Sequence, residues 1–366
     1  MLRGVLRTVR YARCWKAGAD VEAKELEIVR DGERVPATLV LPRRRQGRLP
    51  AWVALGGVSR MGRLHPQLVR FANALATSGA AVLVPEVPEW RRLRVSPRVT
   101  APTIRGCLDA LRDRSEARPG KIGLVGFSFG APQVAIAASR EDLAEHVAGI
   151  VLFGGYCSLE STVTCQLTGH HEWMGERHQL SPDPYGRWVV ASNHLTDVPG
   201  YEDATDVAMA LHHLAAAASD QRISAWMPHH DAMIEGLRSS LPKCRRPLFD
   251  CFATPTHAPR PAVEGCDDLA RRLAAACRRV EPLLEPQHAL ADVAVPTRLI
   301  HGRGDRLIPF TEGYRMMARL PHGMGHDLTV TSLFAHSADE SCGSLPTLVR
   351  ENVALFGAIR GLINTV

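Results

Sequence analysis

Lysine is scarce in this chain, and clusters of basic residues are missing from it. Only four of the 366 residues are lysine, so arginine supplies nearly all of the positive charge behind a formal net charge of +6. A basic excess of this size is a weak indicator of nucleic-acid binding, and the sequence contains no recognisable nucleic-acid-binding motif. We therefore expect no nucleic-acid partner.

Long apolar runs and paired cysteine motifs are also missing. No segment has the roughly 18 consecutive apolar residues that a membrane-spanning helix needs. The first residues, "MLRGVLRTVRYARCWK", lack the apolar core of a signal peptide. The nine cysteines form no C-x-x-C pair, and the chain is too long for a disulfide-dense scaffold. These absences predict a cytoplasmic protein with reduced thiols and no membrane span.

Residues 1–20 predict an N-terminal helix. Leu2, Leu6 and Val9 share one helical face, with arginines between them. We expect this helix to pack on the domain, and weak attachment to an anionic membrane surface is the alternative.

The remaining composition is that of a globular protein, with 45% hydrophobic and 22% charged residues. Short, continuously apolar segments at 52–55, 122–125 and 297–300 alternate with amphipathic helical segments. Continuous hydrophobicity indicates strands covered on both faces, so we expect an α/β fold with a mostly parallel, doubly wound sheet. Residues 25–42 predict an edge hairpin around the turn dipeptide Asp31-Gly32.

The alternation of strands and helices stops between 157 and 290 and then resumes. This division predicts a first core part at 1–156, a large and mainly helical lid insertion at 157–290, and a second core part at 291–366.

The segment "GFSFG" places Ser128 between Gly126 and Gly130, directly after an apolar strand and before a helix. This is the nucleophile-elbow pattern, in which a sharp turn exposes a serine hydroxyl. Small flanking residues relieve the crowding between strand and helix, and the helix N-terminus favours developing negative charge.

A nucleophilic serine needs a base, and the base needs an orienting acid. In "HGRGDRLIP", Asp305 follows the predicted strand at 297–300, and in "FAHS", His336 follows the last predicted strand. His322 and His326 are alternative bases, but they precede that strand. We expect His301 to hold the loop that bears Asp305.

The chain resembles the α/β-hydrolase superfamily, and the segments that carry the resemblance are "GFSFG", "HGRGDRLIP" and "FAHS". The resemblance covers about residues 25–156 and 291–366. Within this superfamily, the sequence looks most like the dienelactone-hydrolase and acyl-peptidase-like branches. The resemblance implies a catalytic triad in which Ser128 is the nucleophile, Asp305 the orienting acid and His336 the general base and then acid.

An oxyanion hole needs two backbone N–H donors. We expect one from Phe129 and the other from the loop after the strand at 52–55, where Val58 is the first candidate and Gly57 the second. In the same loop, Arg60 is a candidate for binding an anionic substrate group.

The insertion carries the side chains from which a substrate pocket could be built. Trp173, Trp188 and Trp226 are candidates for its lining if the insertion covers Ser128, with a role in the protein core as the alternative. Its paired histidines lack the spacing of metal ligands, so we expect no metal site.

The sequence thus predicts a serine esterase that hydrolyses a small-molecule carboxylic ester through an acyl-enzyme on Ser128, without a cofactor. Amide or peptide hydrolysis and thioester hydrolysis are alternative activities. An alternative of another class is a catalytically inactive binding protein of the same fold. The sequence leaves the oligomeric state open, a homo-oligomer included.

Overall fold

The computed structural model describes residues 2–259, 263–333 and 345–366. Within these ranges the core is an eight-stranded sheet in the order β1-β2-β4-β3-β5-β6-β9-β10. The strands are β1 (Val21–Arg30), β2 (Glu33–Pro42), β3 (Ala51–Leu55), β4 (Ala81–Pro85), β5 (Ile122–Phe127), β6 (Val147–Phe153), β9 (Thr297–Gly302) and β10 (Asp327–Thr331).

From β4 to β10 all neighbouring strands of this sheet are parallel. Every residue of β3 and β4 is buried, as expected for strands that are covered by helices on both faces. The predicted α/β class and mostly parallel sheet are therefore confirmed.

The edge of the sheet is the predicted hairpin. β1 and β2 pair antiparallel along their whole length, and β2 also pairs antiparallel with β4. Asp31 and Gly32 form the turn with φ values of 48° and 85°. Two left-handed residues in succession are typical of a type I′ turn, which matches the twist of the two strands.

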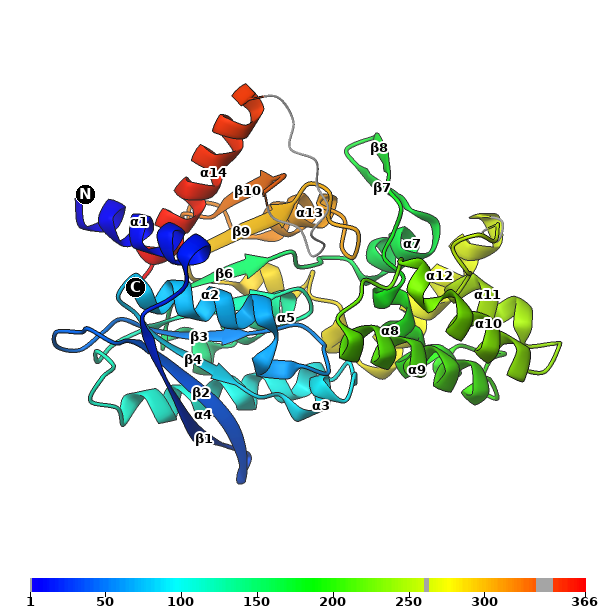
Figure 1. The fold of residues 1–366 in the computed structure, drawn as a ribbon, viewed down its shortest axis with the longest axis horizontal. Coiled ribbons are helices and arrows are strands. Elements are labelled where there is room, and N and C mark those ends of the chain that lie inside the picture. The colour runs from blue at the N-terminus through cyan, green and yellow to red at the C-terminus, as the bar shows by residue number, and fades with distance from the viewer. Residues whose placement is uncertain (1, 260–262, 334–344) are drawn as a thin grey trace.

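Helices cover both faces of the sheet (Figure 1). On one face α1, α2 and α14 share an apolar cluster with the strands, and on the other face α4 and α5 do so. The helices of the core are α1 (Leu2–Ala17), α2 (Pro66–Thr77), α3 (Pro88–Arg91), α4 (Thr100–Arg112), α5 (Gly130–Ala138), α6 (Glu141–Ala144), α13 (Thr311–Arg319) and α14 (Leu345–Ile363).

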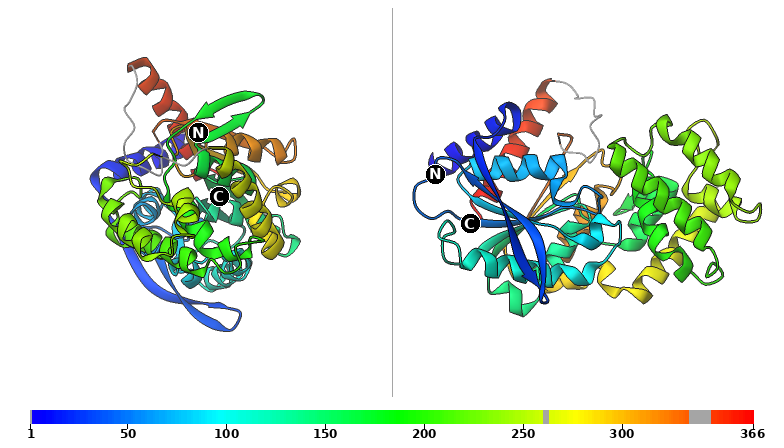
Figure 2. Two further views of the ribbon diagram at one scale, coloured as in Figure 1. Left: turned by 90° about the vertical axis from the view of Figure 1, so that its right-hand side faces the viewer. Right: turned by 60° about the horizontal axis from the view of Figure 1, so that its bottom comes forward.

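The segment between β6 and β9 forms a largely helical body at one end of the sheet (Figures 1 and 2). Its helices are α7 (Leu159–Thr168), α8 (Tyr185–His194), α9 (Thr205–Gln221), α10 (Asp231–Ser240), α11 (Arg246–Phe252) and α12 (Val263–Val280). It also contains a small antiparallel hairpin of β7 (His170–Trp173) and β8 (Glu176–Gln179), which the sequence did not predict. Met174 and Gly175 form its turn, with φ values of 51° and 83°.

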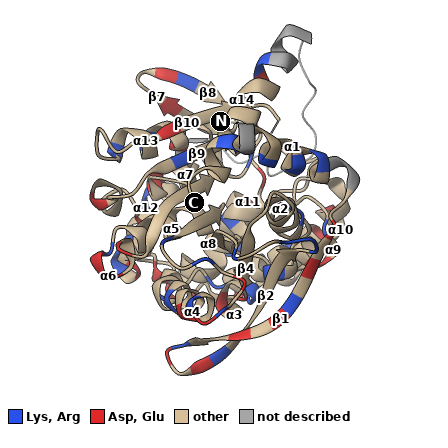
Figure 3. Cartoon of the chain, turned by 90° about the vertical axis from the view of Figure 1, so that its left-hand side faces the viewer, with Lys and Arg blue, Asp and Glu red and all other residues tan. Residues whose placement is uncertain are grey.

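Charges of both signs are interspersed on the face that Figure 3 shows, for example along β1. Ion pairs such as Arg45–Glu22 and Arg140–Asp142 account for part of this pattern. On α1, Leu6 and Val9 are about half exposed, whereas Tyr11 is buried against α2. Within the described ranges, no helix combines the length and the apolar composition that a membrane crossing requires.

Candidate active site

Ser128 lies on the tight turn between β5 and α5. Its φ is +52°, in the left-handed region that L-residues rarely adopt. Its N–H donates a hydrogen bond of 2.8 Å to the carbonyl oxygen of Phe153, at the end of the neighbouring strand β6. A strained backbone of this kind persists where the surroundings hold it, and such residues cluster at functional sites.

The two glycines that flank this turn relieve real crowding. A Cβ at Gly126 would lie 2.4 Å from the carbonyl oxygen of Gly130, and a Cβ at Gly130 would lie 2.3 Å from that of Gly56. Both contacts are with backbone, which cannot rotate away as a side chain can. The spacing of "GFSFG" therefore has the steric origin that the sequence indicated.

The loop after β3 lies directly against the serine. A Cβ at Gly57 would be 3.1 Å from the Cβ of Ser128 and 3.4 Å from its Oγ. The Tyr185 hydroxyl donates a 3.0 Å hydrogen bond to the carbonyl oxygen of Val58, which ties this loop to the start of α8. Neither the N–H of Val58 nor that of Phe129 donates to another group within the described part of the chain.

Asp305 lies in the loop after β9 and is 1% exposed. Its Oδ1 accepts hydrogen bonds from the backbone N–H groups of Leu307, at 2.9 Å, and Ile308, at 3.1 Å. His301 Nε2 donates to the carbonyl oxygen of Ile308 at 2.9 Å and lies 3.7 Å from Asp305 Oδ2. The carboxylate is thus fixed by its own loop, and His301 holds that loop.

The predicted base, His336, falls outside the described residues. Of its two alternatives, His322 is exposed, and His326 accepts a 3.1 Å hydrogen bond from the N–H of Thr297 through Nδ1. Burial lowers the pKa of His326. His326 therefore has a structural contact at the start of β9, at the opposite end of that strand from the loop of Asp305.

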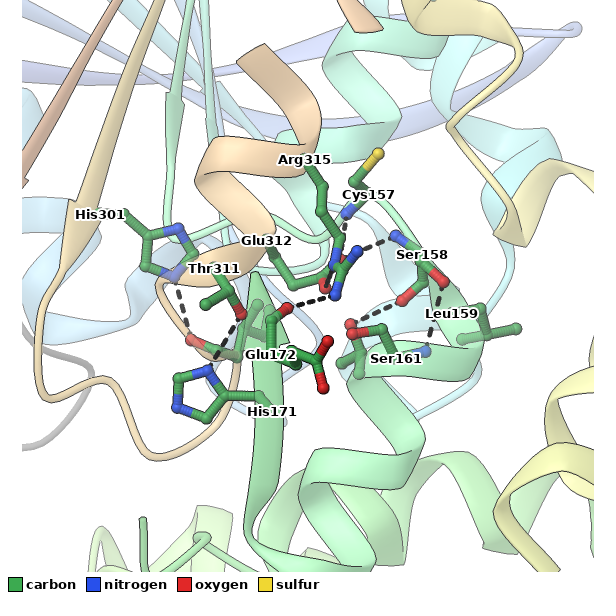
Figure 4. Close-up of polar contacts among 12 residues, drawn as sticks. Cys157, Ser158, Leu159, Ser161, His171, Glu172, His301, Thr311, Glu312 and Arg315 are labelled. Carbon is green, nitrogen blue, oxygen red and sulfur yellow. Dashed lines mark hydrogen bonds and ion pairs between the residues drawn. The ribbon is translucent and has the colours of Figure 1, made fainter. Parts of the chain in front are cut away.

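A buried carboxylate that the sequence did not single out joins α13 of the core to the first residues of the insertion (Figure 4). Glu312 of α13 accepts hydrogen bonds from the N–H groups of Cys157, at 2.9 Å, and Ser158, at 2.8 Å. Arg315 donates to its other oxygen at 3.0 Å. Burial raises the pKa of the Glu312 carboxyl, while the two backbone hydrogen bonds act in the opposite direction. Glu312 thereby fixes the chain where it leaves β6 and enters the insertion.

The hairpin of the insertion makes a second connection to the same region (Figure 4). His171 is buried, and its Nδ1 lies 3.1 Å from the Thr311 hydroxyl. Burial, followed by the neighbouring His178, lowers the pKa of His171 to about 4. The ring is therefore neutral at pH 7.

Ser128 opens onto a cavity of about 100 Å³ between the core and the insertion. A single water needs only roughly 10–15 Å³, so the space accommodates part of a ligand. Most of the wall is apolar, and α7, α8 and the loop of Asp305 contribute Leu159, Val163, Val189, Val190, Leu307 and Ile308. No sequence pattern indicated these residues, because they come together only in the fold.

The predicted substrate-binding residues are not among the described residues that line this cavity; they are Arg60, Trp173, Trp188 and Trp226. Arg60 pairs with Asp220 of α9 at 2.7 Å. Trp173 stacks on Tyr314, with ring centroids 6.2 Å apart, and the Arg306 guanidinium covers Trp226.

Trp188 belongs to the protein core, which the sequence analysis gave as the alternative role of the three tryptophans. It is fully buried in the insertion and donates to the carbonyl oxygen of Phe252.

Across the described ranges no group of three His, Cys, Asp or Glu side chains is placed to hold a metal ion.

No protein-family model matches the sequence, and no curated protein matches it in sequence. The structure, in contrast, is similar to solved hydrolases. Acylaminoacyl peptidase from Pyrococcus horikoshii aligns with a TM-score of 0.51 and 12% identity, over 94% of this chain and 41% of the peptidase. Brefeldin A esterase, a bacterial homologue of human hormone sensitive lipase, aligns with a TM-score of 0.48 and 15% identity, over 94% of this chain and 76% of the esterase. Est1E from Butyrivibrio proteoclasticus aligns with a TM-score of 0.46 and 11% identity, over 92% of this chain and 99% of Est1E.

Proposed function

We propose that this chain, which has the α/β-hydrolase fold shared with the acylaminoacyl peptidase, is a serine hydrolase that cleaves carboxylic esters. The fold by itself hosts many activities, so the proposal is carried by the site. Its main support is the left-handed Ser128 on the β5–α5 turn, which faces an apolar cavity and lies against the Gly57 loop.

In the proposed reaction the Ser128 hydroxyl attacks the ester carbonyl carbon while its proton passes to His336. Asp305 orients the imidazole, a role that its rigid position in the β9 loop suits. The negative charge that forms on the carbonyl oxygen is stabilised by the N–H groups of Phe129 and Val58. The assignment of His336 rests on the order of the three residues in the sequence.

The tetrahedral intermediate collapses when His336 returns its proton to the leaving alcohol, which leaves an acyl group on Ser128. A water molecule, deprotonated by His336, then attacks the acyl carbon, and the carboxylic acid departs. The alcohol leaves before water enters, whereas the acyl group stays attached throughout. An apolar cavity beside the serine therefore suits the acyl group.

The insertion supplies α7 and α8 to this cavity, so we propose that it acts as the lid of the site. The chain spans only 41% of the length of the acylaminoacyl peptidase, so the activity of that whole protein is not carried over to this chain.

The test is hydrolysis of p-nitrophenyl esters with acetyl, butyryl and octanoyl groups by the wild-type protein and by Ser128→Ala. We expect turnover by the wild type and a loss of at least roughly a thousandfold in the variant. Parallel assays of a p-nitroanilide and a thioester separate the alternative activities. A well-folded wild type that turns over none of them would support the inactive binding protein instead.

A further inference from the structure

His194 is a polar side chain with an unused ring nitrogen in the mostly apolar wall of the cavity. It is 7% exposed, and its Nδ1 lies 2.9 Å from Asp197 Oδ2, in the short 3₁₀ helix Leu195–Asp197 that follows α8. Its Nε2 is buried and has no hydrogen-bond partner among the described residues. The ring edge that carries Nε2 faces away from Asp197.

The course of α8 indicates that His194 lies away from Ser128 along the cavity wall. Tyr185, the first residue of α8, bonds to the Val58 carbonyl beside the serine, whereas His194 is the last residue of the same helix. Gly186 and His194 both line the cavity, and the helix rise places them about 12 Å apart. An acyl chain that starts at Ser128 and follows α8 therefore ends at His194.

The contact with Asp197 determines what His194 offers to a ligand. A carboxylate can only accept, so Nδ1 carries a proton, and in the neutral ring Nε2 is an acceptor. A buried acceptor without a partner costs free energy, and a ligand that donates a hydrogen bond removes that cost. Thr162, another polar residue of the wall, is already bonded through its Oγ1 to the carbonyl oxygen of Ser158.

We propose that the His194–Asp197 pair forms a polar subsite that binds a hydroxyl group at the end of the substrate's acyl chain. A hydroxyl both donates and accepts, so it satisfies Nε2 in either protonation state of the ring. A carboxylate has no proton to donate to Nε2 of the neutral ring and would be repelled by Asp197, and an ammonium would lose its hydration against apolar walls. The preferred substrate is thus the ester of an ω-hydroxy acid of medium chain length.

Gln166 places a second acceptor on the path to this subsite. Its Nε2 donates to the carbonyl oxygen of Leu307 at 3.1 Å, and its Oε1 is buried without a partner among the described residues. It occupies the space that a side chain at Gly186 would fill. A second hydroxyl along the chain would find an acceptor here.

This inference rests on the proposed esterase function. The first experiment compares kcat/KM for p-nitrophenyl ω-hydroxyoctanoate and for p-nitrophenyl nonanoate, in which a terminal methyl group replaces the hydroxyl. We expect kcat/KM to be roughly ten- to a hundredfold higher for the hydroxy ester, because the unmatched analogue leaves Nε2 unpaired. Equal values, or a preference for the nonanoate, would overturn the subsite.

The variants separate hydrogen bonding from packing. His194→Phe keeps the wall filled and should reverse the preference, and Asp197→Asn should reduce it by weakening the hold on Nδ1. Val190→Ala, on the same helix and cavity wall, should change kcat/KM for both esters by the same factor. A preference that survives in folded His194→Phe would contradict the assignment, and Asp197→Asn gives an independent result if His194→Phe does not fold.

A binding measurement makes failure of the subsite distinguishable from failure of the esterase function. Ser128→Ala protein is titrated with ω-hydroxyoctanamide and with nonanamide in a calorimeter. Tighter binding of the hydroxy amide by at least roughly tenfold supports the subsite even if no ester is hydrolysed. Equal affinities, or no binding of either amide, would overturn it even if simple esters are hydrolysed.

Discussion

The backbone of Gly57 lies so close to Ser128 that a Cβ at position 57 would sit 3.1 Å from the serine Cβ and 3.4 Å from its Oγ. Few real Cβ atoms have contacts this short. The loop after β3 can therefore pack this closely against the nucleophile turn because residue 57 has no side chain. This proximity places the Val58 peptide beside the atom that is proposed to attack.

The first prediction concerns this contact. Gly57→Ala should lower kcat/KM by on the order of 100-fold, because the new methyl group displaces either the serine or the proposed oxyanion donor by a fraction of an ångström. Gly236→Ala is the matched control, since Gly236 is in α10 with open space around its Cα. It should leave activity unchanged and raise the free energy of unfolding by up to about 1 kcal/mol. Full activity of Gly57→Ala would exclude this loop from the site.

The second prediction tests Asp305 as the orienting acid. Asp305→Asn can still accept the N–H groups of Leu307 and Ile308 through its amide oxygen, so the loop should keep its shape. Its amide group cannot hold the imidazole in the required tautomer, and kcat should fall by roughly a thousand- to ten-thousandfold. The melting temperature and the ester kinetics are measured together, with exposed Asp292→Asn as the control. A folded Asp305→Asn with normal kcat would remove Asp305 from the mechanism.

The third prediction identifies the base. His336→Asn should abolish ester hydrolysis, whereas His326→Asn should retain most of it, because an asparagine oxygen can take over the hydrogen bond from Thr297 N–H. The comparison is made on kcat at saturating ester, after both variants are shown to be folded. Loss of activity in His326→Asn alone would transfer the role of the base to that residue.

The fourth prediction concerns the acyl cavity. Val163 is a buried residue of α7 on the cavity wall, and Val163→Phe fills part of the 100 Å³ beside Ser128. The kcat/KM for octanoyl esters should fall by roughly tenfold or more, while that for acetyl esters changes little. An unchanged ratio of octanoyl to acetyl hydrolysis would mean that the acyl group binds elsewhere.

The fifth prediction is a pH dependence of stability from His171. Its pKa is about 4 in the folded protein, because burial disfavours the charged ring, and about 6.5 in an unfolded chain. Between these values the unfolded state binds more protons, so the free energy of unfolding should decrease as the pH falls from about 6.5 to 4. The asparagine of His171→Asn can contact the Thr311 hydroxyl without titrating, so urea unfolding of this variant should show a shallower slope over that range. Identical slopes would show that His171 is accessible to protons in the folded state.

The core of the fold was predictable because its signals are local. Continuous apolar segments bounded by glycine gave β3, β5 and β9, and the Asp31-Gly32 dipeptide gave the edge hairpin. The two catalytic candidates that the structure describes, Ser128 and Asp305, each follow a strand directly. Since parallel strands end at one edge of the sheet, sequence position alone could place both of them there.

The insertion was less predictable because its signals are tertiary. The hairpin β7–β8 has mostly polar residues and a Met174-Gly175 turn, so neither apolar alternation nor a typical turn dipeptide marks it. The sequence singled out Trp173, Trp188 and Trp226 as pocket candidates by residue type. Valine and leucine are the commonest residues in the cavity wall, and in a sequence they look like any other core residues.

The most direct test of the central claim is the intact mass of the protein after treatment with a fluorophosphonate, followed by peptide mapping. Such reagents modify serines that a working base and oxyanion hole have activated. The account predicts one adduct per chain, located on Ser128 and missing in Ser128→Ala. A folded wild type that gains no adduct, or gains it on another residue, would contradict the assignment of Ser128 as the nucleophile.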